Sequence, residues 1–401
     1  MNNNKASDKL KTIMDFGLQP RCFDYIENKD NDLKLFNFTL CQSKKSGLLQ
    51  LGNPIPAESL KPNYSWIQNK EPDDHAYLIA EQVLKYASNN DAKVLFLSKY
   101  DKTVYELVKE SLGSRAILLD ANKDLGILDT NPNQALIQEK INLNNLEHLS
   151  SFFGQFDIIV TSRLLEHANN IHSFVNVLTG LLKEDGKIIV EVPDSTKSLL
   201  QGDVAMLWEE HTYYFTPESL RLEFDLLGYS IENYILYNYP QEDALIGIFN
   251  RNKNSSIEKT SSSLPFGEYT IANIFKKKVE YLQYELNNQL SSLKDKFGEI
   301  VIFGAGHRAI MFINLLGVSN LISFVIDDDP NKNNLKIPPT GIEIKNSEEI
   351  NLNDVGVCIF AISLNAEEKV KKVLSQKINR KIKYYSISPD SQYFLPIFNR
   401  L

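Results

Sequence analysis

The sequence predicts an α/β protein with two doubly wound parallel-sheet domains and a small β-rich module at its N-terminus. Three observations predict this class. Continuous apolar runs alternate with helical patterns, as expected where helices cover both faces of parallel strands. A polar, Ser-rich stretch from Asn250 to Ser263 separates two such series. A length of 401 residues suits two or three domains better than a single core.

The first segment, residues 1–75, holds short apolar runs at Leu33–Leu40 and Gly47–Leu51. Turn-forming residues separate these runs, so we expect a small β-rich module there. The rest of the chain is expected to form an α/β domain, a linker with a long helix and a second α/β domain, over residues 76–252, 253–297 and 298–401.

The first α/β domain opens with a helical pattern at Ala76–Ala87, and further helical patterns lie at Val104–Leu112 and Ile171–Lys183. Residues 229–249 predict two closing strands in a hairpin. The other predicted strands lie at Val94–Leu97, Ala116–Asp120, Phe156–Ser162 and Lys187–Pro193.

Beyond the linker, apolar residues recur at three-to-four spacing, or multiples of it, from Ile271 to Phe297, which predicts a long amphipathic helix packed between the two domains. The second α/β domain begins after Gly298. Its predicted strands lie in the stretches 299–306, 321–329, 355–363 and 381–387.

Composition excludes several classes of function. The net charge is -8 and no basic run exceeds Lys276–Lys278, so nucleic acid is not an expected partner. No stretch reaches the roughly 20 apolar residues of a membrane helix, and the N-terminus lacks the apolar centre of a signal peptide. We therefore expect a cytoplasmic protein that does not bind membranes.

The three cysteines, Cys22, Cys41 and Cys358, lie far apart in the sequence. Their odd number and wide spacing fit a reducing compartment, so we expect free thiols. Cys22 and Cys41 lack the C-x-x-C spacing of a structural zinc site, and no nearby histidine completes four ligands. The sequence therefore predicts no zinc and no other metal site.

A glycine-rich turn, Gly304-Ala305-Gly306, directly follows a predicted strand and precedes a helical pattern that contains Ala309. Glycines permit a tight turn, and the helix N-terminus offers N–H groups to a phosphate. Asp327 lies about 20 residues later, where a ribose-binding acid is expected. The turn predicts a phosphate or nucleotide site; the alternative is a turn needed only for packing.

The segment Trp208–Phe215, which follows a predicted strand, is rich in side chains that transfer protons or stack on rings. His211 suits a general base because its ordinary pKa lies near neutrality. Glu210 is expected to orient it, and Tyr213 or Tyr214 to share a proton. His167, just beyond another predicted strand, is expected to line a pocket at the same sheet edge. A structural role for both histidines is the alternative.

These residues and three groups of motifs resemble the sugar-nucleotide C-methyltransferases, which act on keto-deoxysugars attached to a nucleoside diphosphate. The resemblance covers nearly the whole chain. It implies a zinc-binding-like N-terminal module, a class I methyltransferase domain and a C-terminal Rossmann-like domain. The matching stretches are Asp15–Pro20 and Gly47–Leu51, then Asp157–Asp194 and Glu209–Phe215, then Gly304–Ala309, Val325–Lys332 and Ser363–Glu368.

The resemblance implies that a histidine removes a proton beside a sugar ketone, and that the resulting enolate takes a methyl group from S-adenosylmethionine. By position, His211 is the base, with Glu210 and Tyr214 beside it. The implied donor contacts are Ser98, Asp101, Thr103, Asp120 and His167. The implied contacts to the nucleoside-diphosphate sugar are Tyr64, Gly304, Gly306, His307, Arg308, Asp327 and Asn365.

The chain departs from the family pattern at three places. Glu209 replaces the first histidine of the family's proton-transfer motif, and Trp208 replaces its tyrosine. Ser43 and Ser46 lie near the second expected pair of zinc cysteines. The donor motif of the form E-x-G-x-x-x-G has lost its glycines, because Phe96, Ser98 and Lys102 occupy its three defined positions.

Four functions follow as alternatives. The first is an active C-methyltransferase, which the Glu210–His211 pair favours. The second is a sugar-nucleotide-binding protein without methyl transfer, which the glycine loss favours. The third is an isomerase or epimerase that uses the same base without a methyl donor. The fourth is a nicotinamide dehydrogenase that uses the glycine-rich turn; the resemblance gives that domain a substrate-holding role instead.

Overall fold

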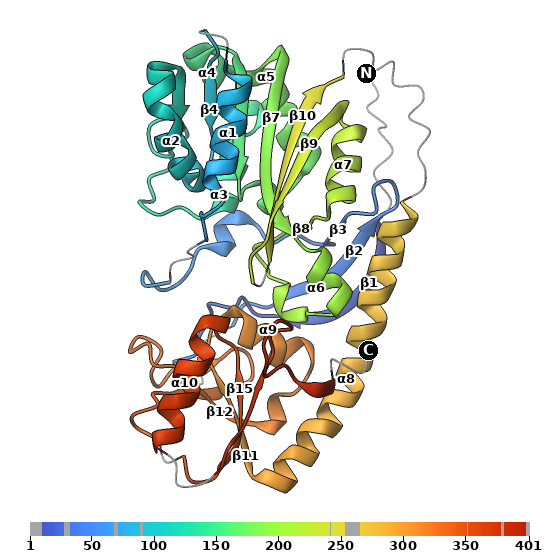
Figure 1. Ribbon diagram of the computed structural model, residues 1–401, viewed down its shortest axis with the longest axis vertical. Coiled ribbons are helices and arrows are strands. Elements are labelled where there is room, and N and C mark those ends of the chain that lie inside the picture. The colour runs from blue at the N-terminus through green and yellow to red at the C-terminus, as the bar shows by residue number, and fades with distance from the viewer. Residues whose placement is uncertain are drawn as a thin grey trace.

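Two α/β units lie one above the other, the N-terminal strands lie between them, and one long helix runs along their side (Figure 1). Most of the predicted Ser-rich linker, from residue 253 onward, lies outside the described residues. The structure is a computed structural model that describes residues 10–27, 33–67, 71–88, 91–240, 242–252, 265–350, 352–377 and 381–397.

The first α/β unit contains a six-stranded sheet of order β5-β4-β6-β7-β10-β9. The first four strands in this order are parallel, and the last two close the sheet antiparallel as the predicted hairpin. The bounds are β4 Val94–Phe96, β5 Ala116–Leu118, β6 Phe156–Ser162, β7 Leu182–Asp194, β9 Tyr229–Tyr237 and β10 Asp243–Arg251.

Helices cover both faces of this sheet, which is why its strands are apolar on both sides. One face packs against α1 (Ala76–Tyr86) and α2 (Lys102–Leu112). The other packs against α4 (Leu143–Phe153), α5 (Ile171–Leu181) and α7 (Pro217–Leu226). The unit also contains two shorter helices, α3 Gln134–Lys140 and α6 Thr196–Gln201.

The C-terminal unit is a second six-stranded sheet, of order β13-β14-β12-β11-β15-β16. All pairs except β13 with β14 are parallel. The predicted fold class is confirmed, although the sequence analysis did not predict β13 or β14. The bounds are β11 Glu299–Phe303, β12 Ile322–Ile326, β13 Lys336–Ile337, β14 Ile342–Lys345, β15 Val355–Phe360 and β16 Lys383–Ser386, with α9 His307–Leu315 and α10 Leu364–Lys377.

The long helix α8 (Phe266–Phe297) is the predicted amphipathic helix. Its buried stripe shares one core with the N-terminal strands, α6 and the C-terminal sheet. Figure 1 shows the helix running beside the N-terminal strands and the C-terminal unit. The helix therefore joins the three parts of the molecule. The stripe consists of Ala272, Phe275, Val279, Leu282, Leu286 and Leu290.

The N-terminal module is a four-stranded antiparallel sheet of β1 (Leu10–Gln19), β2 (Phe36–Ser43), β3 (Leu49–Leu51) and β8 (Tyr213–Tyr214). Strand β8 comes from the first α/β unit and pairs with β3. The module is therefore completed by a segment that follows it by more than 160 positions in the sequence. This pairing fixes the C-terminal end of the loop that carries residues 208–212.

The family's second pair of zinc-binding cysteines is expected near Ser43 and Ser46. In this chain, hydroxyl and carboxyl groups form the contacts at that place instead. Ser46 Oγ lies 2.9 Å from Ser43 Oγ and donates to the Glu223 carboxylate. All three cysteines are free, as predicted, and the structure buries all of them. Among the described helices, none combines the length and apolarity that a membrane crossing requires.

Short 3-10 helices connect several elements. They lie at Ala57–Leu60, Lys99–Asp101, Gly113–Arg115, Leu165–His167, Val204–Met206 and Ser319–Leu321.

Truncating the stripe of α8 should destabilise the whole chain. Leu286 is fully buried, so we expect Leu286→Ala to cost about 2 to 5 kcal/mol, from lost apolar burial and the cavity left behind. Tyr284 on the same helix is 72% exposed, and Tyr284→Ala should change stability by less than about 0.5 kcal/mol. Urea unfolding followed by circular dichroism tests this; equal losses in the two variants would contradict the packing described.

Glu268, in the first turn of α8, should make stability depend on pH. Burial raises the pKa of its carboxyl to about 7. Between about pH 4.3 and pH 7 the unfolded chain is ionised at Glu268 while the folded chain keeps the proton, so stability falls as pH rises. Glu268→Gln should remove this loss, roughly 3 kcal/mol between pH 4 and pH 8. Urea unfolding at both pH values tests it, with the exposed Glu280→Gln as control; an unchanged pH dependence would refute it.

Candidate functional site

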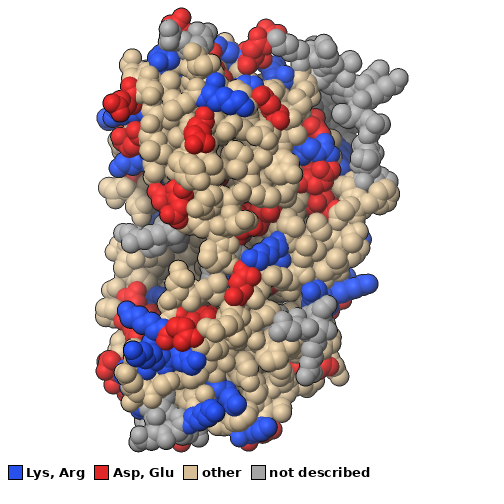
Figure 2. Space-filling model, viewed as in Figure 1, with Lys and Arg blue, Asp and Glu red and all other residues tan. Residues whose placement is uncertain are grey.

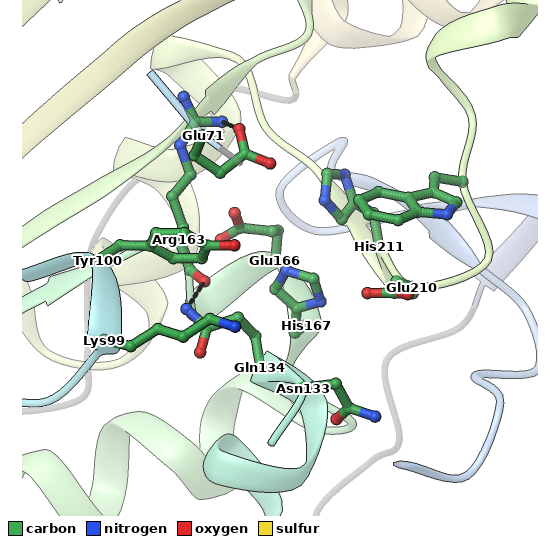
Figure 3. Close-up of a pocket in the computed structure, with 11 residues that line it drawn as sticks. Glu71, Lys99, Tyr100, Asn133, Gln134, Arg163, Glu166, His167, Glu210 and His211 are labelled. Carbon is green, nitrogen blue, oxygen red and sulfur yellow. Dashed lines mark hydrogen bonds and ion pairs between the residues drawn. The ribbon is translucent and has the colours of Figure 1, made fainter. Parts of the chain in front are cut away.

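Three adjacent cavities lie where the two α/β units meet, and all three are lined by Glu71 and Arg163. The donor-side cavity, of about 230 Å³, borders the turn between β4 and α2. The inter-unit cavity, of about 390 Å³, is lined by residues of both units, and Figure 2 shows a hollow at this height. A small central cavity lies beside them (Figure 3). Ligands of doubly wound sheets bind at this carboxyl edge of the strands.

Backbone N–H groups of the turn after β4 donate hydrogen bonds to side chains of the same turn. The Asp101 carboxylate accepts hydrogen bonds from the backbone N–H groups of Leu97 and Ser98, at 3.0 and 2.7 Å. Ser98 Oγ accepts from the N–H of Tyr100, which completes a capping box. Burial raises the pKa of Asp101 to about 7. These N–H groups are therefore used inside the turn, while the side chains of Lys99 and Tyr100 line the cavities.

The other expected donor contacts are divided between the cavity and the surface. Thr103 lines the donor-side cavity and donates to Asp73 Oδ2 at 2.7 Å. Asp120 is exposed, and its carboxylate accepts from the N–H groups of Asn122 and Lys123 in its own turn. The hydrogen bond from Lys123 lowers the pKa of Asp120. Asp120 therefore acts as a cap of its own turn here.

Arg163 is the central cation of the site, and the sequence analysis did not identify it. It directly follows β6, its φ of 50° lies in the left-handed region, and its side chain is 6% exposed. Its Nε lies 2.8 Å from Glu191 Oε1, and Nη1 lies 3.9 Å from Glu71 and 4.0 Å from Glu242. The sequence could have indicated Arg163 as a site residue, because it lies at the carboxyl end of a predicted parallel strand.

His211 lies on the wall shared by the central and inter-unit cavities. Its ring is 4.9 Å from that of His167 and 5.0 Å from that of Trp208, measured between centroids. Burial, together with nearby His167, lowers the pKa of His211 well below its ordinary value. The imidazole is therefore neutral. The Tyr214 hydroxyl lies 3.1 Å from both the N and the O of Trp208, so it holds the loop that carries His211.

Glu210 lines the central cavity with His167, and burial raises the pKa of Glu210 to about 8. Within the described residues, no hydrogen bond joins its carboxyl group to His211. Burial lowers the pKa of His167 to about 3. Glu209, the replacement for the family's histidine, accepts from the N–H of Cys22 at 2.6 Å and so joins the loop to the N-terminal module.

In the glycine-rich turn of the C-terminal unit, Gly304 is closely packed, whereas the space beside Gly306 is open. Gly304 has φ of 104°, and a Cβ there would lie 2.7 Å from the Ala361 carbonyl oxygen. Asp327 Oδ2 accepts from the N–H of Ala305 at 2.8 Å, so this acid holds the turn. Gly306, at the start of α9, has open space around the position a Cβ would take.

Three of the expected substrate contacts line the inter-unit cavity: His307, Arg308 and Asn365. Arg308 Nη2 donates to Asp203 at 3.1 Å, whereas its buried Nε has no partner among the described residues. Tyr64 lies elsewhere, in an aromatic group with Tyr25 and Trp66. Its hydroxyl donates to Glu27 at 2.9 Å, and it lines none of the three cavities.

Both α/β units match models of known protein families. Residues 96–234 match the model of a methyltransferase domain, and residues 256–385 match that of a C-methyltransferase C-terminal domain. Together the two matches support the S-adenosylmethionine-dependent C-methyltransferase family. The resemblance to C-methyltransferases is thereby confirmed, whereas the sugar-nucleotide acceptor stays a prediction. Neither match covers the N-terminal module, so its likeness to a zinc-binding module stays a prediction.

Solved methyltransferase structures resemble part of the chain. The magnesium protoporphyrin IX methyltransferase of Synechocystis, solved with bound S-adenosylhomocysteine, is 10% identical, with a TM-score of 0.29, over 47% of this chain and 91% of its own. An S-adenosylmethionine-dependent methyltransferase of Archaeoglobus fulgidus is 14% identical, with a TM-score of 0.29, over 44% and 94%. These scores carry no further argument. No curated protein matches the sequence.

The donor-side cavity offers side-chain contacts for S-adenosylmethionine in place of the usual backbone contacts. Glu71, Asp73 and Glu191 line it beside Lys99, Lys102 and Arg163, and its carboxylates suit the ammonium group of the donor and its ribose hydroxyls. Side chains, rather than the N–H groups of the turn, would therefore hold the donor.

Replacing Arg163 should strongly destabilise the protein. Arg163→Met leaves Glu191 buried without its cation, which should cost about 3 to 5 kcal/mol. Arg221→Met is the matched control, because Arg221 is 33% exposed and pairs with Glu218 and Asp225 at the surface; it should cost less than about 1 kcal/mol. Urea unfolding measures both, and similar losses would show that Arg163 does not neutralise the buried carboxylates.

Proposed function

We propose that the protein transfers a methyl group from S-adenosylmethionine to the carbon beside the carbonyl of a nucleoside-diphosphate keto-deoxysugar. The observation that carries this proposal is the place of His211. Its neutral imidazole lies on the wall between the central cavity, next to the donor side, and the inter-unit cavity. A base there faces an acceptor in one cavity and a donor entering from the other.

The inter-unit cavity has the chemistry to hold a sugar nucleotide. The half-buried Arg308 guanidinium, which pairs with Asp203 and has an unpartnered Nε among the described residues, provides donors for a diphosphate, and the N-terminus of α9 adds N–H groups. Ser198, Tyr239 and Asn365 add groups that bond sugar hydroxyls. The volume of about 390 Å³ lies within the usual range of ligand cavities.

In the proposed reaction, a nitrogen of His211 accepts the proton from the carbon beside the ketone. The electrons of that C–H bond move to the carbonyl oxygen, which becomes an enolate. Trp208 lines the same cavities, and its buried indole N–H has no partner among the described residues, so it is available to donate to this oxygen. The bound donor supplies the methyl group that the carbon then takes.

The self-bonded turn after β4 favours a second candidate, in which the same base works without a methyl donor. Proton removal and return beside the carbonyl would make the protein an epimerase or isomerase of sugar nucleotides. The capping box of Ser98 and Asp101 supports it, because the turn's N–H groups already have partners. A sugar-nucleotide-binding protein without catalysis is the remaining form of this candidate.

Two measurements separate these candidates. Calorimetric titration with S-adenosylmethionine and S-adenosylhomocysteine, beside a panel of nucleoside-diphosphate sugars, should show binding of both donor forms in the micromolar range. Deuterium exchange beside the ketone in D₂O, without methyl transfer and without donor binding, would instead establish the second candidate. Sugar-nucleotide binding with neither deuterium exchange nor methyl transfer would indicate a sugar-nucleotide-binding protein without catalysis.

His211→Gln should reduce methyl transfer by on the order of 100-fold to 10,000-fold, because the base is lost. Mass spectrometry of the sugar product measures this. Binding of the sugar nucleotide, followed by calorimetry, should change little. The control is His148→Gln, an exposed histidine of α4. Unchanged turnover in His211→Gln would refute the role of this side chain.

A further inference from the structure

Glu166, His167 and His211 form a group of two imidazoles and one carboxylate beside the central cavity. Their potential ligand atoms all lie within 4.8 Å of one another, and Figure 3 shows the three side chains around one common space. Glu166 and His167 belong to the 3-10 helix that follows β6, and His211 comes from the loop before β8. Two imidazoles with one carboxylate are a common ligand set for divalent transition metals.

The hydrogen-bond partners of this group are incomplete. Glu166 is fully buried, yet neither of its carboxyl oxygens has a hydrogen-bond partner among the described residues. His167 is 6% exposed, and its Nδ1 likewise has no partner there. Buried polar atoms are nearly always satisfied by protein, water or a ligand, so these three atoms are free to bind one shared partner in the space between them.

The size and charge of the central cavity suit a small cation. Its volume of about 30 Å³ is close to that of one water molecule, too small for a sugar or a nucleoside. Glu71, Glu166 and Glu210 line it, against Lys99 and Arg163. Arg163 is paired with Glu191, so Lys99 is the other cation that faces these three carboxyl groups in the lining of the cavity.

We propose that Glu166, His167 and His211 bind a divalent transition-metal ion such as Zn²⁺ or Co²⁺, with a remaining position open to the cavity. The sequence analysis predicted no metal because it considered the cysteines, and this ligand set contains none. An imidazole nitrogen that binds the metal cannot accept a proton. The metal-bound form is therefore inactive in the reaction proposed above, a consequence that rests on that proposed function.

The test is direct metal binding by the full chain, without substrate. Metal-stripped protein is titrated with Co²⁺, followed by visible absorption and by calorimetry, and Zn²⁺ is then added as a competitor. We expect one Co²⁺ ion per chain, a visible band typical of low coordination number, and displacement by Zn²⁺. Glu166→Gln and His167→Gln should each weaken binding by on the order of 100-fold, as loss of a ligand does.

Two controls separate this site from other metal-binding groups. His148→Gln removes an exposed histidine, and Cys22→Ser removes a buried thiol of the N-terminal module; both should bind Co²⁺ as the unchanged chain does. Circular dichroism confirms the fold of each variant. Failure of the unchanged chain to bind Co²⁺, or equal weakening in the controls and the ligand variants, would overturn the proposal. Neither outcome depends on turnover, so the proposed function is tested separately.

Discussion

The pairing of β8 with β3 positions the candidate site. Two residues of the first α/β unit, Tyr213 and Tyr214, complete the sheet of the N-terminal module by pairing with Gln50 and Leu49. Because the chain is held there, the preceding loop crosses the junction between the units, where it carries His211. The Tyr214 hydroxyl fixes the other end of this loop through the backbone of Trp208.

The N-terminal module extends this constraint to the C-terminal unit. The Tyr25 hydroxyl donates to the Ala305 carbonyl oxygen at 2.5 Å, within the glycine-rich turn, and the N–H of Cys22 donates to Glu209 in the loop. The rings of Trp208 and His307 stack at 5.1 Å between centroids. One small module thus sets the distance between the proposed base and the proposed diphosphate contacts.

Electrostatics at the junction is dominated by buried carboxyl groups. Burial raises the pKa of Glu210 to about 8 and that of Glu242 to about 7, so both tend to keep a proton near neutrality. Arg163 is the cation that these carboxyl groups surround. Binding of a positively charged methyl donor, or of a metal ion at Glu166, His167 and His211, would favour loss of these protons, because a nearby cation stabilises the ionised carboxylate.

The sequence by itself determined the two doubly wound sheets, the closing hairpin and the long helix. Each of these depends on the period of apolar residues within one segment, and such periods are local. It also indicated His211 and the turn at Gly304 as candidate site residues, through motifs of a few neighbouring positions. Only the tertiary structure showed that Asp101 bonds the N–H groups of its own turn, and that Arg163 is surrounded by carboxyl groups. Only it joined β8 to the N-terminal sheet and brought Glu166 and His167 next to His211. These features depend on contacts between distant segments, and no local pattern records which segments will meet.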